Sequence, residues 1–222
     1  GDWLQTNPGV NITVGEQTLN LVSKQPDTHS EAGTGYFKKS WNGGEITPQM
    51  GNVSISKSTT GPAWGALYWQ YFEHLDKISG HNSPLRIHKQ LFIKTNTENG
   101  PVLQPINDSN TLQVGQQITV RVELSTDRDL EYVHLKDMRA AGFEPVNTLS
   151  GYRWNGGLGY YENTRDAASN YFFSYLPKGT WIFEYPLTVT HSGTFSNGIT
   201  TVECMYAPEY SAHSEGSQVI IR

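Results

Sequence analysis

From residue 85 to the end of the chain, apolar and polar side chains alternate with a period of two. In one such run, Ile118, Val120, Val122 and Leu124 are separated by single polar residues. Successive side chains of a strand point to opposite faces, so this pattern predicts strands with one buried face. Similar alternating or densely apolar runs occupy residues 85–93, 133–135, 171–176, 181–189, 202–206 and 219–221. Seven short strands separated by turn signals predict an all-β fold, an immunoglobulin- or fibronectin-like sandwich.

Composition supports an all-β fold for the whole chain. The 222 residues include 22 Gly, 12 Tyr and 6 Trp, and only 17% are charged. Aromatic residues favour strands, and glycine favours turns. Residues 1–60 are patterned more weakly, with short strands predicted at 12–14, 18–22 and 53–56. So few strands rarely form a stable sheet alone. We therefore expect a smaller β unit at residues 1–78 and the sandwich at residues 79–222, with the boundary at 79–84.

Residues 64–78 fit two structures. Trp64, Leu67 and Tyr71 follow a helical spacing, whereas residues 66–72 alternate as a strand would. The aromatic density and a Gly-Pro pair just upstream favour a strand at 66–72, followed by a short turn. We also expect Trp64, Leu67, Trp69 and Tyr71 to be partly buried between the two units, because a large exposed apolar patch usually marks a contact surface.

Charge and cysteine content exclude several classes of protein. Lys and Arg total 16 and Asp and Glu total 21, so the formal net charge is −5. A nucleic-acid-binding module or a protein held on anionic lipid would be basic. The single cysteine, Cys204, excludes an internal disulfide and a four-cysteine zinc site. It shares a strand face with Val202 and Tyr206, so we expect a buried and inert thiol.

The sequence contains no catalytic or metal-binding motif that we recognise. It lacks a Gly-x-Ser-x-Gly elbow, a phosphate-binding glycine loop and a His-Glu-x-x-His pair. The clusters at residues 127–129 and 163–166 offer oxygen ligands without the spacing of a calcium loop, so we expect turns with local caps and ion pairs. We predict no catalytic residue, no metal site and no cofactor. A pair of glycosidase carboxylates is the remaining enzymatic alternative, because the sequence does not define how far apart the acids lie.

A glycine-rich stretch at residues 155–159 is flanked by Trp154, Tyr160 and Tyr161. Two interpretations of these rings are open. Exposed rings in a loop would stack on sugars, which would make the chain a carbohydrate- or surface-binding module. Alternatively, the rings close one end of the sandwich, because aromatic side chains bury large areas.

An ordered series of short motifs covers roughly residues 62–210. They are PAWGALYWQYF (62–72), KQLF (89–92), LQVGQQITVRVEL (112–124), DRDLEYV (127–133), EPVN (144–147), LSGY (149–152), LPKGT (176–180), GTF (193–195) and MYAPE (205–209). This series resembles the C-terminal region of bacterial alpha-2-macroglobulin family proteins. Residues 1–61 resemble part of the CUB-like β-domain of that family less distinctly.

The resemblance implies a macroglobulin-type β-sandwich at the end of a long envelope protein. Such proteins inhibit proteases by trapping: cleavage of a bait segment triggers closure around the protease. The resemblance implies that this fragment is a non-catalytic structural and interaction region, not an enzyme. Its partners would be upstream domains of its own parent chain and, through that parent, host or environmental proteases. It also implies an extracytoplasmic bacterial location, in the periplasm or on the outer cell surface.

Some members of the family capture proteases through a thioester, whose motif is Cys-Gly-Glu-Gln. The chain instead reads Val14, Gly15, Glu16 and Gln17. Valine has no thiol, and the flanking residues indicate a strand and a turn instead of the start of a thioester-domain helix. The sequence therefore predicts no thioester here, and the ligand-binding residues stay unknown.

Overall fold

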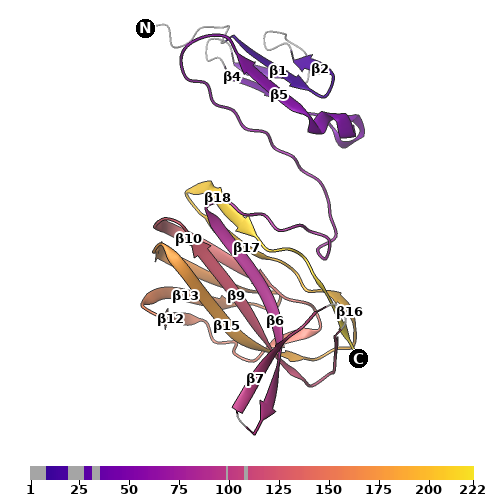
Figure 1. The fold of residues 1–222 in the computed structure, drawn as a ribbon, viewed down its shortest axis with the longest axis vertical. Coiled ribbons are helices and arrows are strands. Elements are labelled where there is room, and N and C mark those ends of the chain that lie inside the picture. The colour runs from indigo at the N-terminus through magenta and orange to yellow at the C-terminus, as the bar shows by residue number, and fades with distance from the viewer. Residues whose placement is uncertain (1–8, 20–27, 32–35, 99, 108–109) are drawn as a thin grey trace. The chain divides into compact units, whose positions relative to one another are not determined.

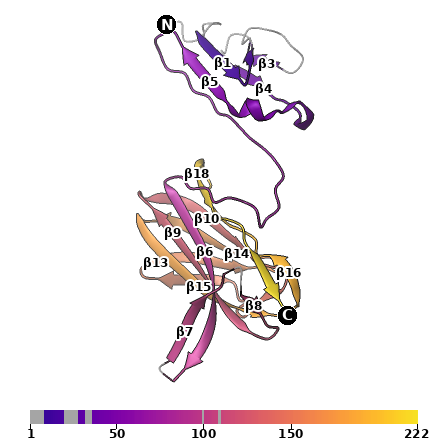
Figure 2. The same cartoon turned by 45° about the vertical axis from the view of Figure 1, so that its right-hand side comes forward.

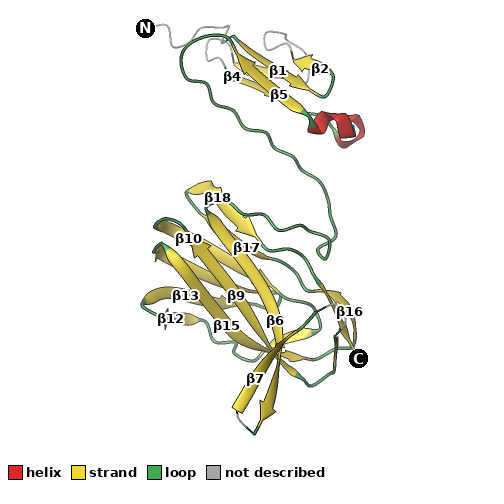
Figure 3. Ribbon diagram, viewed as in Figure 1, coloured by secondary structure: helices red, strands yellow, loops and turns green. Residues whose placement is uncertain are grey.

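The computed structural model describes residues 9–19, 28–31, 36–98, 100–107 and 110–222. Its contacts divide the chain into two compact units, residues 1–70 and 71–222, and we describe each by itself (Figure 1). Both units are built from strands, and the described helices are two short 3-10 turns (Figure 3). The predicted all-β class is confirmed. No helix in the described ranges has the length and apolar character needed to cross a membrane.

The first unit contains two small antiparallel sheets. One has the strand order β2-β1-β5, and the other pairs β3 with β4. Val14 and Met50 are the buried apolar side chains of this unit's described part. The strands predicted at 12–14 and 53–56 lie in β1 and β5; the one predicted at 18–22 begins in β2, and its residues 20–22 lie outside the described residues. The elements are β1 (Val10–Val14), β2 (Gln17–Leu19), β3 (Thr28–Glu31), β4 (Tyr36–Lys39), η1 (Gly43–Glu45), η2 (Pro48–Gly51) and β5 (Val53–Lys57).

Residues 62–74 form neither the predicted strand nor the alternative helix. They are an extended segment without regular secondary structure. Trp64 is 88% exposed, and Leu67, Trp69 and Tyr71 are exposed as well. Burial of these side chains between the two units stays a prediction. Aromatic residues favour strands because they pack against a neighbouring strand on a pleated surface. The structure pairs no strand with this segment, so its composition alone does not produce one.

The second unit is a β-sandwich of two large antiparallel sheets, visible face to face in Figure 1 and Figure 2. One sheet has the order β12-β13-β14-β10-β17-β18 and the other β11-β15-β9-β6-β7. A third sheet, β16-β19-β8, contains one parallel pair, β19 with β8. The strands are β6 (Leu85–Thr97), β7 (Gly100–Pro105), β8 (Thr111–Leu112), β9 (Gln117–Thr126), β10 (Leu130–Met138), β11 (Phe143–Pro145), β12 (Gly151–Asn155), β13 (Leu158–Thr164), β14 (Ala168–Leu176), β15 (Gly179–Val189), β16 (Gly193–Ser196), β17 (Thr200–Cys204), β18 (Ala207–His213) and β19 (Gln218–Ile221).

The core of the sandwich follows from the alternating sequence. In β9, Ile118, Val120, Val122 and Leu124 are each at most 1% exposed. They belong to one apolar cluster with the inward-facing side chains of β10, β14, β15 and β17. Burial of this much apolar surface is the main force that holds the two sheets together. Each of the seven strands predicted in this half overlaps an observed strand, although the run predicted at 202–206 extends two residues beyond the end of β17.

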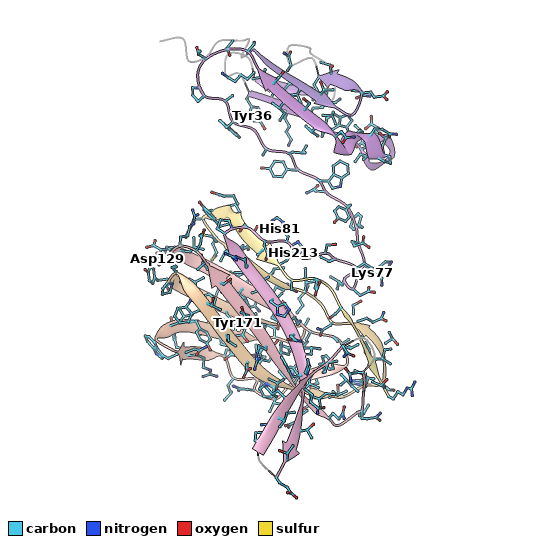
Figure 4. All side chains as sticks on the ribbon, viewed as in Figure 1. Tyr36, Lys77, His81, Asp129, Tyr171 and His213 are labelled. Atoms are coloured by element: carbon cyan, nitrogen blue, oxygen red, sulfur yellow. The ribbon has the colours of Figure 1, made fainter. Side chains whose placement is uncertain are left out.

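The segment that leads into β6, residues 75–83, runs along the end of the sandwich, and we call it the strap. The backbone N–H of His81 donates to the carbonyl of His213 in β18, and the N–H of His213 donates back, both at 2.9 Å. Gly216 donates to the carbonyl of Ile78 at 2.8 Å. Figure 4 shows the His81 and His213 side chains beside each other. The strap therefore ties the start of the sandwich to its C-terminal strands.

Candidate functional site

The thioester-like residues of the first unit form a tight hairpin. Val14 ends β1, Gln17 begins β2, and the two residues are paired across the hairpin. Gly15 occupies the turn at φ +59, a left-handed conformation that favours glycine. Val14 is buried, which makes it part of the small core of this unit. The strand and turn that the flanking residues predict are thus observed.

The predicted acidic turn at residues 127–129 is held by local bonds. Arg128 Nε donates to Asp127 Oδ1 at 2.8 Å, and Lys178 N donates to Asp129 Oδ1 at 2.7 Å. The hydrogen bond from Arg128 lowers the pKa of Asp127, and the backbone N–H of Lys178 lowers that of Asp129. Figure 4 marks Asp129 at the end of the sandwich. These carboxylates cap a turn and pair with a neighbour, as the interpretation without calcium predicts.

Cys204 lies on the inward face of β17. It is buried, as Val202 is. Its thiol donates to the carbonyl oxygen of Glu131, with Sγ at 3.2 Å. Tyr206, which the sequence assigns to the same face, is 80% exposed instead. The reason is that β17 ends at Cys204 and the chain turns immediately afterwards, so the alternation no longer applies.

The histidines do not gather into a ligand cluster within the residues that the structure describes, where no group of three His, Cys, Asp or Glu side chains could hold a metal ion. His134 lies on the outer face of β10 and stacks on Phe172 of β14, with ring centroids 4.7 Å apart and planes at 7°. Its Nε2 lies 3.0 Å from Asn170 Oδ1. These contacts give His134 a structural role in pairing β10 with β14.

A cleft of about 360 Å³ lies at the open side of the sandwich, where β12 and β13 of one sheet face β15 of the other. The described side chains around it combine aromatic rings with hydrogen-bonding groups. Its lining consists of Trp154, Asn155, Tyr160, Glu162, Tyr171, Ile182, Phe183, Glu184 and Tyr185. The accessible lining of the cleft is mostly polar, so the cleft offers hydrogen-bonding groups more than apolar walls. Its volume lies in the range of small-molecule sites, above about 300 Å³. This cleft is the candidate functional site.

The glycine-rich stretch beside the cleft is a hairpin, and its rings lie on strands instead of in a loop. Asn155 pairs with Leu158, which leaves Gly156 and Gly157 as a two-residue turn. Both glycines have positive φ, +58 and +92, the combination that a type I′ hairpin turn requires. Trp154 lies in β12, and Tyr160 and Tyr161 lie in β13. The prediction that these rings lie in a loop is therefore wrong.

Trp154 and Tyr160 of this hairpin have different roles. Tyr160 points inward and its ring contacts those of Phe173 and Phe183, with centroids 5.7 and 5.4 Å away. Trp154 is 80% exposed and pairs with Gly159 across the hairpin. The interpretation as an aromatic closure of the sandwich thus fits Tyr160, whereas Trp154 is left on the surface.

The inner end of the cleft leads to a buried polar network that the sequence analysis did not identify. The Lys89 ammonium lies 2.8 Å from Asp137 Oδ1, and the two side chains are 4% and 0% exposed. Thr200 Oγ1 donates to the same carboxylate at 2.7 Å, and the Tyr185 hydroxyl donates to its other oxygen. Tyr185 also lines the cleft. The network joins β6 and β15 of one sheet to β10 and β17 of the other.

Burial raises the pKa of two tyrosines at the cleft. The pKa of Tyr185 lies well above its ordinary value because the ring is desolvated and the Asp137 carboxylate is close. The pKa of Tyr171 is raised for the same two reasons, and Figure 4 shows this side chain within the sandwich. Both phenols are therefore neutral hydrogen-bond donors at physiological pH, not bases.

The sequence model described as "Bacterial Alpha-2-macroglobulin MG10 domain" matches residues 85–209. The chain belongs to this family of bacterial alpha-2-macroglobulin domains. The match covers most of the sandwich, including the cleft and the buried network. It confirms the resemblance found in the motifs.

Solved structures of alpha-2-macroglobulins share the fold. Salmonella alpha-2-macroglobulin reacted with methylamine has a TM-score of 0.52 at 18% identity, over 65% of this chain and 10% of that chain. Escherichia coli alpha-2-macroglobulin activated by porcine elastase also has a TM-score of 0.52, at 15% identity, over 96% of this chain and 18% of that chain. Both matched regions are small parts of much longer proteins.

A curated protein, "Circularly permutated Ras protein 2" from Dictyostelium discoideum, is 26% identical over 191 residues. The match covers 80% of this chain but spans only 5% of that protein's length. The chain therefore corresponds to a small part of each of these relatives.

Proposed function

We propose that this chain is a non-catalytic structural and interaction region of a bacterial alpha-2-macroglobulin-like protein, and that its full-length parent traps proteases. The observation that carries the proposal is the family match over residues 85–209. The similarity to solved alpha-2-macroglobulins supports the same fold. A rigid sandwich with a continuous apolar core is suited to holding neighbouring domains at fixed positions.

The domain arrangement follows from the same resemblance. Residues 79–222 would be the terminal macroglobulin-type domain, and residues 1–78 would be part of a CUB-like β-domain whose remaining strands come from elsewhere in the parent. The small sheet β2-β1-β5 supports this, because it leaves few buried side chains in the described part of the unit. The direct partners would then be upstream domains of the parent chain.

The chemistry of the described side chains supports a non-catalytic role. Residues 14–17 have valine before Gly-Glu-Gln and so cannot form a thioester, and Cys204 is buried and hydrogen-bonded to a carbonyl. Asp127 and Asp129 act in a turn. We further propose an extracytoplasmic location, in the periplasm or on the outer surface, where the parent would meet host or environmental proteases.

The test compares this chain with its full-length parent. Each is incubated with trypsin or elastase, and hydrolysis of a large protein substrate and of a small peptide substrate is measured. A trap hinders large substrates sterically, so we expect the parent to suppress protein hydrolysis and to spare peptide hydrolysis. This chain alone should change neither rate and should hydrolyse neither substrate. Inhibition by this chain alone, or no effect of the parent on protein hydrolysis, would contradict the proposal.

A further inference from the structure

His81 of the strap and His213 of β18 form an isolated antiparallel bridge. Each residue donates its backbone N–H to the carbonyl of the other at 2.9 Å. Directly opposed residues of an antiparallel pair place their side chains on the same face, with Cβ atoms about 5 Å apart. The two imidazole rings accordingly lie beside each other, with centroids 5.7 Å apart and planes at 33° (Figure 4). We call these two residues the histidine pair.

A hydrogen bond of His213 determines which of its ring nitrogens carries a lone pair. Its Nδ1 lies 3.2 Å from the carbonyl oxygen of Ser214. A carbonyl oxygen only accepts hydrogen bonds, so Nδ1 carries the proton, and in the neutral ring the lone pair is on Nε2. Metal-binding histidines almost always have this arrangement, in which the other ring nitrogen donates to a carbonyl, a carboxylate or water. His213 is therefore oriented as a metal ligand.

The spacing of the rings suits one shared metal ion. Bonds from zinc to histidine nitrogen are about 2.0–2.1 Å long, so two imidazoles on one tetrahedral zinc ion have their centroids about 5 Å apart. A small rotation of the side chains brings the rings from 5.7 Å to that distance. His81 is exposed and His213 is half-buried, so an ion can reach both rings from solvent.

The two nitrogen donors select the class of metal. Imidazole suits Zn²⁺, Cu²⁺ and Ni²⁺, whereas Mg²⁺ and Ca²⁺ prefer oxygen ligands. Among the described residues, no third His, Cys, Asp or Glu side chain joins the pair, so water would fill the remaining positions. The Cβ of Glu215 lies 3.9 Å from a Cβ placed on Gly80, so a negative charge next to the strap favours a cation here. We propose that the histidine pair binds one Zn²⁺ or a chemically similar divalent transition-metal ion.

Such an ion would fasten the strap to the sandwich. Backbone hydrogen bonds from His81, His213 and Gly216 already join the two, and a metal with one ligand on each side would add a link between side chains. A ligand that binds only the closed strap lowers the population of the opened strap by a factor of 1 + [L]/Kd. At a Zn²⁺ concentration of 100 times Kd, that population would fall about 100-fold. The site does not depend on protease trapping, because it uses side chains of the second unit alone.

The first experiment titrates the full 222-residue chain with ZnCl₂ by isothermal calorimetry, with MgCl₂ as the control ion. We expect Zn²⁺ to bind and Mg²⁺ not to bind. His81→Gln and His213→Gln keep the backbone bonds of the bridge but each removes one ligand, so each should weaken Zn²⁺ binding by at least about tenfold, the lower bound for loss of an outer-shell partner. The matched control is His88→Gln, which removes an exposed imidazole of β6 that is paired with Glu123 instead of a second histidine. It should leave the affinity unchanged.

The second experiment, amide hydrogen exchange, tests whether the bound ion links the strap to β18. At saturating Zn²⁺ the amides of His81, His213 and Gly216 should exchange more slowly in the original chain and in His88→Gln, but not in His81→Gln or His213→Gln. The unfolding midpoint without zinc shows whether each variant is folded. Three results would overturn the proposal: no binding of Zn²⁺, equal affinity in the folded His81→Gln and His213→Gln variants, or unchanged exchange of these amides in the original chain at saturating Zn²⁺.

Discussion

Replacement of Lys89 by methionine tests whether the buried network holds the two sheets together. Methionine has about the same length and no charge, so the variant keeps most of the packing. It removes the ammonium that lies 2.8 Å from Asp137 Oδ1. The carboxylate then keeps its hydrogen bonds from Thr200 and Tyr185 but has lost the cation that is paired with it.

The expected loss of unfolding free energy in Lys89→Met follows from the burial of the ion pair. Breaking a buried ion pair by removing one partner costs about 3–5 kcal/mol, because the remaining charge is left uncompensated. Two hydrogen bonds to the Asp137 carboxylate persist, so we expect the lower end, about 3 kcal/mol. With a urea m-value of about 2 kcal/mol per molar, the unfolding midpoint would fall by about 1.5 M.

The assay is urea unfolding of the full chain, monitored by near-ultraviolet circular dichroism. The double variant Lys89→Met with Asp137→Leu should lose less stability than the sum of the two single variants, because it leaves neither charge of this pair without its partner. The control is Arg121→Met, which breaks an ion pair with Glu184 whose side chains are 38% and 40% exposed. Exposed pairs contribute about 0–1 kcal/mol, so this variant should change stability little.

Two observations would refute this reasoning. One is a Lys89→Met variant that unfolds within about 0.5 M urea of the original chain, the range of an ordinary surface substitution. The other is strict additivity in the double variant, which would mean that Lys89 and Asp137 do not interact energetically.

Three further predictions concern single residues. Cys204 should react slowly with a thiol reagent at pH 7 in the native chain and completely in denaturant, and rapid labelling of the native chain would contradict its burial. Cys204→Ala should lower the free energy of unfolding by about 1 kcal/mol through lost packing. The pKa of Tyr171 and Tyr185 is raised, so the folded state holds these protons longer than the unfolded state. Their contribution to the free energy of unfolding should therefore be fully present below about pH 10 and decline above it. Ultraviolet titration of the phenolates, together with unfolding measured at each pH, checks this. Gly216→Ala places a Cβ 1.9 Å from a carbonyl oxygen of the strap, so hydrogen exchange of the strap amides should accelerate, whereas Gly44→Ala, which meets nothing within 4 Å, should leave it unchanged.

The strands of the core were predictable from alternation alone. In β9 and β15 the apolar residues recur at every second position over most of the strand, and the observed register places them on one buried face. A proline inside a strand predicts an edge or a bulge. Pro186 pairs with β9 on one side, and the pairing of β15 with β11 on the other side begins only at Leu187. The alternation of apolar residues and the residues that favour turns are local properties of the chain, so they can be recognised in a single sequence.

The hairpin of the candidate site was missed for a different reason. Residues 151–155 contain glycine, arginine and asparagine, and both faces of β12 are partly exposed, so no alternation marks it. The signal that could have found it is the Gly156-Gly157 pair, which permits the two positive φ angles of a tight hairpin turn.

The sequence contains a pattern that indicates the buried network, although the sequence analysis did not use it. Lys89 occurs at the same parity as Leu85, Ile87 and Leu91, and Asp137 occurs at the parity of the buried residues of β10. A charged residue at an inward position needs a partner, and one of each sign implies a pair. Which two strands face each other across the core is a long-range property, however, and the sequence alone does not specify it.

The strap determines which hydrogen bonds of the sandwich bear a force that is applied from the N-terminal side. Tension applied to the chain ahead of residue 75 reaches the two hydrogen bonds between His81 and His213, and the one from Gly216, before it reaches β6. Those few bonds are loaded first, whereas β6 is paired with β9 along nine residue pairs from Leu85 to Ile93. A force applied from the N-terminal side would therefore separate the strap from β18 while the two sheets stay packed. The strap would thus extend under loads that leave the sandwich folded.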